Sequence, residues 1–418
     1  MTRADGSDAS ASHEASYVTE ASLVRAERGD GSLSLYHPGH GTSLDVEPES
    51  RTLVDSILSA FAEPLTLAAF FAAQPDFPEE LLALMVRSCF VVEQHERAFL
   101  EHGFLRPTPT PLGAPWVWSD LPELAYPGGW AVLGVPVDMS AAGTGGARHG
   151  PAEIRKVVNG PLLLDEGDVL DHELSRRYPA LRIQVSDLGD VDPDGARMEH
   201  VGGRLCKAVR ELLGHGMRPL VLGGDHSVTH YVLHELIQHV PRFGIIHFDA
   251  HHDMGPSSVV SHANVFGEAL DSPRVASIVQ IGLRVIERVS PYATRVASPK
   301  RQIVSARMAQ AGHALRCLEA LPRDLPYYLS FDIDCIDAAV ARETGTPAFG
   351  GLSFELASEL VDYVARSFEL LGADFVEVSG SLLQPNAAAL IAASLLQRVL
   401  IGKSAFEPLT SDVYKFGG

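Results

Sequence analysis

The sequence has few cysteines and no long apolar run, and both absences narrow its class. Its four cysteines are widely spaced and form no CxxC pair: Cys89, Cys206, Cys317 and Cys335. We therefore expect neither a disulfide framework nor a zinc–thiolate site, and we predict a reducing, cytoplasmic environment. No apolar run reaches the length of a membrane-spanning helix, so we expect no membrane segment.

Basic residues are also scarce relative to acidic ones. The 33 Lys and Arg stand against 53 Asp and Glu, which gives a formal net charge of −20. Such a surface repels nucleic acid and acidic membranes, and we predict neither as a partner. With 418 residues, 46% of them hydrophobic, the chain has the size and composition of one large globular domain plus a smaller one.

The N-terminal part of the chain differs in composition from the rest. Residues 1–43 are rich in Ser, Ala, Asp and Glu and lack the pattern of a signal peptide, which predicts a disordered leader. Residues 44–105 predict a small, mainly helical domain. Residues 106–128 hold many prolines and predict an extended linker. The catalytic domain is expected at 129–418.

The order of elements within 44–105 resembles a winged helix. Apolar spacing predicts helices near 53–61, 65–71 and 79–87, followed by a short strand at 90–92 with 104–105 as its partner. A plain helical cap is the alternative. The segment carries three arginines against eleven acidic residues, too little positive charge for DNA. We therefore expect a peptide or protein partner.

From Trp130 onward, short apolar runs alternate with amphipathic segments such as 201–213 and 354–368. The strand candidates are 130–136, 182–186, 219–222, 244–248, 277–281, 327–331 and 375–378. This alternation predicts an α/β domain in which helices cover both faces of a parallel sheet.

Acidic residues and histidines gather where the strands of this sheet are expected to end, which is where such sheets bind ligands. Asp249, His251 and Asp253 follow one strand, and Asp332 and Asp334 follow another. In an extended chain each set shares one face. Burying these charges without a cation would cost on the order of several kcal/mol each. Two such clusters carry more negative charge than one divalent ion needs and favour two. A solvated polar loop is the alternative.

A third strand ends in Gly-Gly-Asp-His-Ser at 223–227. The glycines allow close backbone approach, and Ser227 can cap the following helix. His226 is a metal-ligand candidate here, although a lone histidine in this position is more often structural. Mixed oxygen and imidazole ligands favour Mn²⁺, while zinc, iron and nickel remain alternatives.

Together these clusters resemble the signature motifs of the ureohydrolase superfamily, which includes arginase, agmatinase, guanidinobutyrase and formimidoylglutamase. The three motifs are at 223–227, at 249–253 (Asp-Ala-His-His-Asp) and at 330–334 (Ser-Phe-Asp-Ile-Asp). Further matches lie at 134–138, 146–151, 154–155, 187–191, 345–347, 350–352 and 376–378. The resemblance covers about residues 130–405 and leaves residues 1–125 outside it.

The resemblance implies a three-layer α/β/α fold, a binuclear manganese site and a homo-oligomer. By position, one ion would take His226, Asp249, Asp253 and Asp332. The other ion would take Asp249, His251, Asp332 and Asp334. Together these six positions would hold the two Mn²⁺.

The resemblance also implies three catalytic roles. Asp253 would orient the attacking water and pass its proton to the leaving amine. Glu377 would bind the guanidinium group, and His262 would act as a proton shuttle. Glu377 has the alternative role of a satisfied strand-end carboxylate, and Ala263 stands where the family usually has glycine after His262. The products would be urea and an amine.

The sequence departs from the family near the expected substrate entrance. Asp337-Ala338, Ala341-Arg342 and Ser379-Gly380 replace the family's Asp-Pro, Ala-Pro and Asn-Pro. The loop at 254–261 is shorter than in arginase, and no residues match those that hold the α-carboxylate and α-amine of free arginine there. Free arginine is therefore not the expected substrate.

Two substrate hypotheses follow. In the first, the enzyme converts arginine side chains of a peptide to ornithine, and the domain at 44–105 holds a leader peptide. In the second, it hydrolyses a guanidino-containing small molecule such as agmatine, a guanidino acid or guanidine. Two hypotheses of other classes are a non-catalytic binding protein that kept the fold and a deacetylase-like hydrolase, against which Glu377 argues.

Overall fold

The structure is a computed structural model that divides the chain into two compact units, Met1–Gly103 and Phe104–Gly418. It describes residues 16–19, 24–27, 32–37, 42–62, 65–87, 91–93, 105–106, 127–139, 145–159, 162, 167–193, 198–255, 260–286, 295, 297–380 and 386–409.

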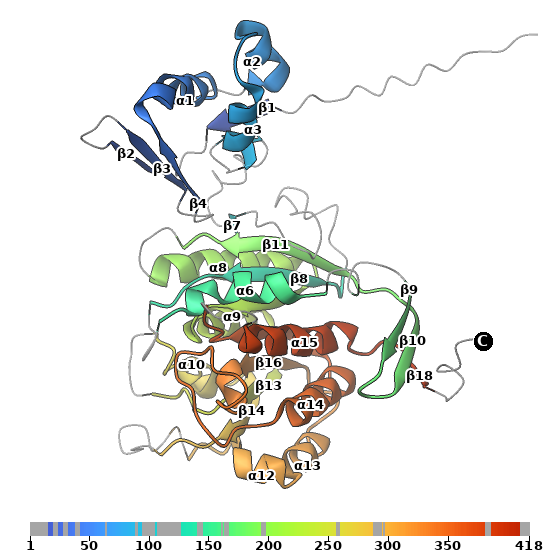
Figure 1. Ribbon diagram of the computed structural model, residues 1–418. Coiled ribbons are helices and arrows are strands. Elements are labelled where there is room, and N and C mark those ends of the chain that lie inside the picture. Colours follow the sequence, from blue (N-terminus) through green and yellow to red (C-terminus); the bar gives the residue numbers. More distant parts are fainter. Residues whose placement is uncertain are drawn as a thin grey trace, which may run out of the picture. The chain divides into compact units, whose positions relative to one another are not determined.

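The large unit is built on a nine-stranded sheet of order β15-β14-β13-β16-β17-β12-β8-β11-β7 (Figure 1). Its strands are β7 (Leu105–Arg106), β8 (Trp130–Val135), β11 (Val185–Val191), β12 (Arg218–Gly223), β13 (Phe243–Phe248), β14 (Val275–Leu283), β15 (Arg301–Ser305), β16 (Tyr327–Asp332) and β17 (Leu370–Val376). Every neighbouring pair is parallel except β11 and β7. The carboxyl ends of the eight parallel strands therefore meet at one edge of the sheet.

Helices cover both faces of this sheet (Figure 1). On one face pack α6 (Gly150–Val157), α12 (Ala306–Gln310), α13 (His313–Glu319), α14 (Phe354–Ser367) and α15 (Ala387–Ile401). The other layer holds α8 (Met198–Gly214), α9 (Ser227–His239) and α10 (Gly267–Asp271). The predicted three-layer α/β/α fold is confirmed.

The strands are apolar on both sides because helices bury both faces. On β12, Leu220 and Leu222 belong to the core cluster under α6, α14 and α15, while the intervening Val221 is equally buried. Burying each such side chain contributes roughly 1.5–3 kcal/mol. Apolar side chains on both faces of the strands therefore stabilise the sheet by packing against the two helical layers.

All seven strand candidates overlap strands of this sheet, and two of them differ from the observed strands in their bounds. The candidate at 182–186 overlaps only the start of β11, and that at 375–378 only the end of β17. The sequence did not predict β15, nor the separate sheet of β9 (Gly167–Asp171), β10 (Arg176–Leu181) and β18 (Glu407–Pro408). These strands are half-exposed and rich in polar residues, so their apolar pattern is weak.

The small unit contains two three-stranded sheets, β2-β3-β4 and β5-β1-β6. Its elements are β1 (Ser16–Thr19), β2 (Val24–Glu27), β3 (Leu33–His37), β4 (Thr42–Val46), α1 (Pro48–Ala60), β5 (Leu65–Thr66), α2 (Leu67–Ala73), α3 (Glu79–Arg87) and β6 (Val91–Glu93). The three helices lie where the sequence predicted them. Val54, Ile57, Phe61, Phe70 and Met85 form part of a core within this unit.

Two expectations for this region need correction. The strand at 90–92 was expected to pair with 104–105, but β6 pairs with β1, and Leu105–Arg106 pairs with Asp190 and Val191 of β11. A strand at the edge of a sheet can pair with any strand that lies beside it, and the local sequence pattern does not specify that partner. The strands between 16 and 46 also differ from a disordered leader, and Leu33 and Leu35 are buried. Whether the unit is a winged helix or a cap stays a prediction, and 107–126 of the linker lie outside the described residues.

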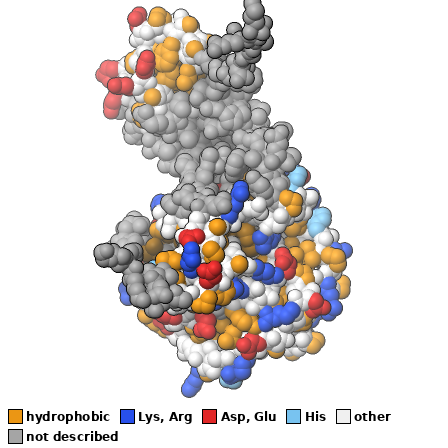
Figure 2. Space-filling view, turned by 90° about the vertical axis from the view of Figure 1, so that its right-hand side faces the viewer, with side chains coloured by type: hydrophobic (Ala, Val, Ile, Leu, Met, Phe, Trp, Pro, Cys, Tyr) orange, Lys and Arg blue, Asp and Glu red, His pale blue; other side chains and the backbone are white. Residues whose placement is uncertain are grey.

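Two findings concern the membrane and disulfide expectations for the described part of the chain. None of its helices is long and apolar enough to cross a bilayer. Cys206, Cys317 and Cys335 form no disulfide. On the face of the large unit drawn in Figure 2, Lys and Arg side chains are interspersed with acidic and hydrophobic ones. The net negative charge is therefore not a continuous acidic surface on that face.

A buried ion-pair network ties α6 to β11. Arg155 is 2% exposed and donates two hydrogen bonds of 2.8 Å to Asp187, one from Nε and one from Nη2. Its Nη1 donates to Asp190 at 2.5 Å. Removing one partner of such a network leaves the others buried and uncompensated, which costs about 3–5 kcal/mol.

We therefore predict that Arg155→Met lowers the thermal unfolding midpoint of the large unit by about 5–15 °C. The matched change Lys403→Met removes an exposed pair with Glu369 and should cost at most about 1 kcal/mol. Circular dichroism melting of both variants checks this. Equal midpoints for the two variants would contradict the assigned role of Arg155.

Candidate metal centre

The predicted metal ligands meet at the carboxyl edge of the sheet. His226 follows β12 and begins the turn into α9, Asp249 follows β13, and Asp332 ends β16. Because β13 and β16 are neighbours and only β17 separates β16 from β12, the three strand ends converge. The structure brings the six predicted ligands into two groups that share Asp249, and a third group joins His247 to His226 and Asp249. Within each group the ligand atoms lie within 4.8 Å of one another.

The first group surrounds Nδ1 of His226. This nitrogen lies 2.8 Å from Oδ2 of Asp253 and 3.3 Å from Oδ2 of both Asp249 and Asp332. The ring is fully buried, yet Nδ1 makes no hydrogen bond. Nε2 lies 3.0 Å from Oγ of Ser330, whose own hydrogen goes to Asp374. Nε2 therefore carries the ring hydrogen, and Nδ1 presents a lone pair to three carboxylates.

A lone pair facing three carboxylates needs a positive charge between them. Burial lowers the pKa of His226, but the neighbouring carboxylates of Asp249, Asp253 and Asp332 raise this pKa well above its usual value. Without a cation the ring would hold a second proton in the position that a metal ion would take. An unpartnered buried nitrogen among carboxylate oxygens fits a divalent metal.

The second group lies on the other side of Asp249. Nδ1 of His251 is 2.9 Å from Oδ2 of Asp334 and 3.4 Å from Oδ1 of Asp249. Burial lowers the pKa of His251, but these two carboxylates raise it to about 12. Asp249 thus offers Oδ2 to the first group and Oδ1 to the second, the arrangement of a bridging ligand. The predicted second set also included Asp332, which the structure places in the first group only.

The carboxylates repel one another in this buried setting. Burial, Asp334 and Asp249 raise the pKa of Asp332 well above its usual value, and burial and Asp249 raise that of Asp334. The four carboxylates, including Asp253, are between 0% and 7% exposed. Bound cations would neutralise them, so the donor set fits the two divalent ions that the sequence predicted.

Two catalytic candidates sit on strained backbone. Asp253 has φ of 48° and Glu377 has φ of 64°, both in the left-handed region that favours glycine. Such a residue costs about 1–3 kcal/mol and persists when its surroundings fix it. Here the strain turns both carboxylates toward His226: Oε1 of Glu377 accepts a 2.8 Å hydrogen bond from the His226 backbone N–H.

Glu377 is held from both ends. Its own N–H donates to the carbonyl of Gly224 at 2.9 Å. A Cβ at Gly224 would lie 1.8 Å from the carbonyl oxygen of Val137, so only glycine allows this approach. Burial raises the pKa of Glu377 to about 8, against the lowering effect of the His226 N–H. A positively charged substrate group beside it would favour the ionised form.

His262 is half-buried and lies in the turn directly before Asn264, which forms an isolated bridge with Met254. Part of the preceding loop, 256–259, lies outside the described residues, and the proton-shuttle role stays a prediction.

Among the departures from the family, Arg342 is exposed, whereas Ser379 is buried and its N–H donates to the Glu343 carbonyl at 2.8 Å. The two substitutions therefore lie in different environments.

Sequence reasoning missed the polar residues that support these ligands. Asp374 on β17 accepts hydrogen bonds of 2.7 Å from Ser330, Tyr328 and Thr229. Nε2 of His247, on β13, lies 2.8 Å from Oδ2 of Asp249. The available signal was an ionisable or amide residue inside an otherwise apolar strand, where burial requires a partner.

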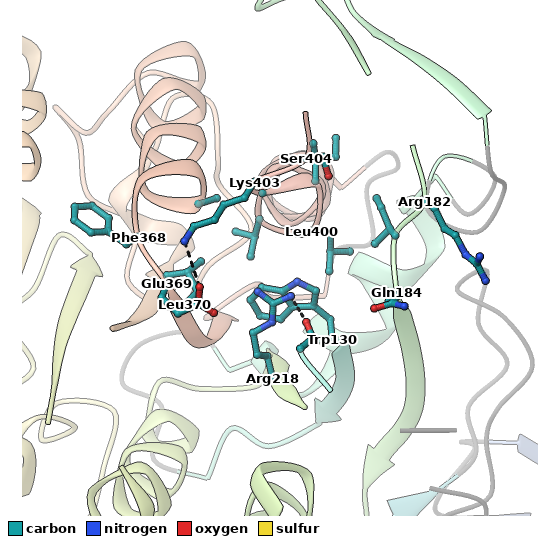
Figure 3. Close-up of a pocket in the computed structure, with 16 residues that line it drawn as sticks. Trp130, Arg182, Gln184, Arg218, Phe368, Glu369, Leu370, Leu400, Lys403 and Ser404 are labelled. Atoms are coloured by element: carbon teal, nitrogen blue, oxygen red, sulfur yellow. Dashed lines mark hydrogen bonds and ion pairs between the residues drawn. The ribbon is translucent and has the colours of Figure 1, made fainter. Parts of the chain in front are cut away.

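A cavity in the large unit lies away from these ligand groups. It has a volume of about 380 Å³ and is lined by residues at the amino ends of β8, β12 and β17, including Trp130, Arg218 and Leu370 (Figure 3). The Arg218 guanidinium stacks 4.2 Å above the Trp130 ring, and Lys403 pairs with Glu369 at 3.2 Å. This edge is opposite to the ligand groups, so the cavity is not the candidate centre.

Comparison with known proteins identifies the family. Residues 129–402 match the model of the Arginase family. The agmatinase of Serratia proteamaculans (strain 568) is 34% identical over 271 residues, which cover 64% of this chain and 84% of that protein. The chain therefore belongs to the arginase family, and the predicted ureohydrolase, a hydrolase of linear amidine C–N bonds, is confirmed.

Solved structures agree with this fold. A hypothetical agmatinase from Burkholderia thailandensis has a TM-score of 0.55 and 28% identity, covering 66% of this chain and 86% of that one. Proclavaminate amidino hydrolase from Streptomyces clavuligerus has a TM-score of 0.57 and 26% identity, covering 67% and 93%. The small N-terminal unit lies outside residues 129–402.

We predict that binding of divalent cations at pH 7 releases protons from this site. The pKa values of His226 and His251 are raised in the cation-free site, so cations must displace their protons. Apparent metal affinity should therefore fall as the pH falls and rise as the pH increases from 6.5.

Calorimetric titration with Mn²⁺ in two buffers of different ionisation enthalpy measures this release. The variant His226→Asn should release about one proton fewer. Replacing the exposed His313 by Asn is the matched control and should leave the release unchanged. Heats that are independent of the buffer would disprove the prediction.

Proposed function

We propose that this protein hydrolyses a small guanidino compound to urea and an amine, with agmatine as the first candidate. The observation that carries the proposal is the position of Glu377 beside two ligand groups that share Asp249. The similarity to proteins named agmatinase supports the substrate class. The inferred location is the cytoplasm, with free thiols at the described cysteines, and the inferred assembly is a homo-oligomer.

The proposed cofactor is a pair of Mn²⁺. One ion would be held by His226, Asp249, Asp253 and Asp332, and the other by Asp249, His251, Asp334 and the shared Asp332. Bound divalent cations lower the pKa of water toward neutrality and so supply a nucleophile at physiological pH. Urea formation by protein loaded in turn with manganese, nickel, iron and zinc tests the choice of metal.

The chain's own side chains would position the substrate and move the proton. Glu377 would accept two charge-assisted hydrogen bonds from the planar guanidinium, and the His226 N–H already fixes the direction of its carboxylate. Asp253, oriented by its strained backbone, would hold the attacking water and carry its proton to the leaving amine. His262 would act as a proton shuttle between the site and solvent.

Hydrolysis of arginine side chains in a peptide is the second candidate. It is supported by a feature of the small unit: β2 is an edge strand of the sheet β2-β3-β4, and an open edge can add a peptide strand. The unit also has a core within its own residues. In this candidate the unit would hold a leader peptide and the large unit would release urea.

One assay separates the two candidates. Mn²⁺-loaded protein is incubated with agmatine, 4-guanidinobutyrate, guanidine, arginine and an arginine-containing peptide, and urea is measured. Urea from small molecules alone supports the first candidate, and urea from the peptide alone supports the second. No urea from any of them, with Mn²⁺ bound, would overturn both in favour of a non-catalytic binding protein.

Glu377→Gln should lower kcat/KM for the guanidino substrate by about 100-fold, mainly through KM, because a neutral amide loses the charge-assisted pair. Metal content should not change, since Glu377 belongs to neither ligand group. The same substitution at the exposed Glu359 is the control. An unchanged KM in the Glu377 variant would exclude guanidinium binding by this residue.

A further inference from the structure

We propose that Gln280 is a positioning residue for the shared ligand Asp249, acting through His247. Gln280 belongs to neither predicted ligand group. The proposal rests on the proposed function only in assuming that the two ligand groups bind divalent cations.

Both oxygens of the Asp249 carboxylate are held by hydrogen bonds. Oδ1 accepts from the backbone N–H of His251 at 2.6 Å, and Oδ2 lies 2.8 Å from Nε2 of His247. All of these atoms belong to fully buried or half-buried residues at the end of β13. Since each oxygen faces a different ligand group, the orientation of the Asp249 carboxylate determines the position of one ligand oxygen in each group.

The bond to Oδ2 requires a hydrogen on Nε2 of His247. A neutral imidazole carries one hydrogen, on either nitrogen, and the partner of the other nitrogen decides which. That partner is Gln280, whose Nε2 lies 2.9 Å from Nδ1 of His247. His247 and Gln280 are direct register partners on β13 and β14.

The orientation of the Gln280 amide follows from two neighbours that each have a single role. Nε of Arg301 can only donate, and it lies 2.5 Å from Oε1. The carbonyl oxygen of His252 can only accept, and it lies 2.8 Å from Nε2. The amide nitrogen therefore points to His247 and donates to Nδ1. The ring hydrogen is thus on Nε2, directed at Asp249.

This network crosses three neighbouring strands, β15, β14 and β13, and ends at the shared ligand. Gln280 has no exposed surface and stands within the apolar strand β14. A hydrophobic residue at this position would bury as well without needing partners. The network therefore serves the direction of Asp249 and not the packing of the sheet.

The test is Gln280→Glu, a change that keeps the shape but removes the donor. A carboxylate cannot donate to Nδ1, so the neutral ring would place its hydrogen there and Nε2 would have none to donate to Asp249. We expect Mn²⁺ affinity, measured by competition with a fluorescent chelator, to fall by about 10- to 100-fold. Gln238→Glu, at an exposed position on α9, is the matched control and should bind like the wild type.

A double-mutant cycle separates positioning from general destabilisation. If Gln280 acts through His247, then Gln280→Glu should have no further effect on metal affinity in a His247→Phe background. Additive losses would overturn the proposal. Melting of the metal-free variants checks that they fold, and Arg301→Met, which releases the amide without altering it, should lower affinity in the same direction.

These measurements use no guanidino substrate, so they are independent of the proposed reaction. Wild-type protein that binds Mn²⁺ but yields no urea would overturn the proposed function. The inference about Gln280 would then still be decided by the ratio of the Mn²⁺ affinities of the wild type and Gln280→Glu. Wild-type affinity in Gln280→Glu would overturn the inference, whatever the urea assay gives.

Discussion

The structure of the large unit depends on one electrostatic constraint: four carboxylates are buried together at the ends of neighbouring parallel strands. Asp249, Asp253, Asp332 and Asp334 are nearly inaccessible to water, and their charges repel one another. Only positive charge at the centre makes this arrangement stable. The imidazoles, the strained turns and the hydrogen bonds around the group are arranged with respect to that charge.

Much of this centre could be predicted from sequence because its signals are local. In an extended chain, alternation would place Asp249, His251 and Asp253 on one face, and the apolar residues before them indicate a buried strand end. His226 was a weaker candidate alone, since its role depends on strands that meet only in the folded sheet. The family motifs supplied that long-range information.

Other features could not be predicted because they depend on contacts between distant residues. Nothing in the local pattern around Leu105 indicates β11 as its partner. The support given by Gln280 and Asp374 needs the register of neighbouring strands, which sequence alone does not provide. The helices of the small unit and the strand near 91 were predictable, whereas the pairing of β1 with β5 and β6, which joins residues far apart in the chain, was not.

The left-handed backbone at Asp253 and Glu377 has a consequence for how this protein can change. Glycine is the residue that this conformation favours, and it would relieve strain on the order of 1 kcal/mol or more at each position. Selection for robustness alone would therefore move these two positions toward glycine and remove the carboxylates. A relative or laboratory variant that gains thermal stability by a change at either position should therefore be assayed first for lost activity. At these two positions the backbone conformation sets thermal stability against catalytic activity.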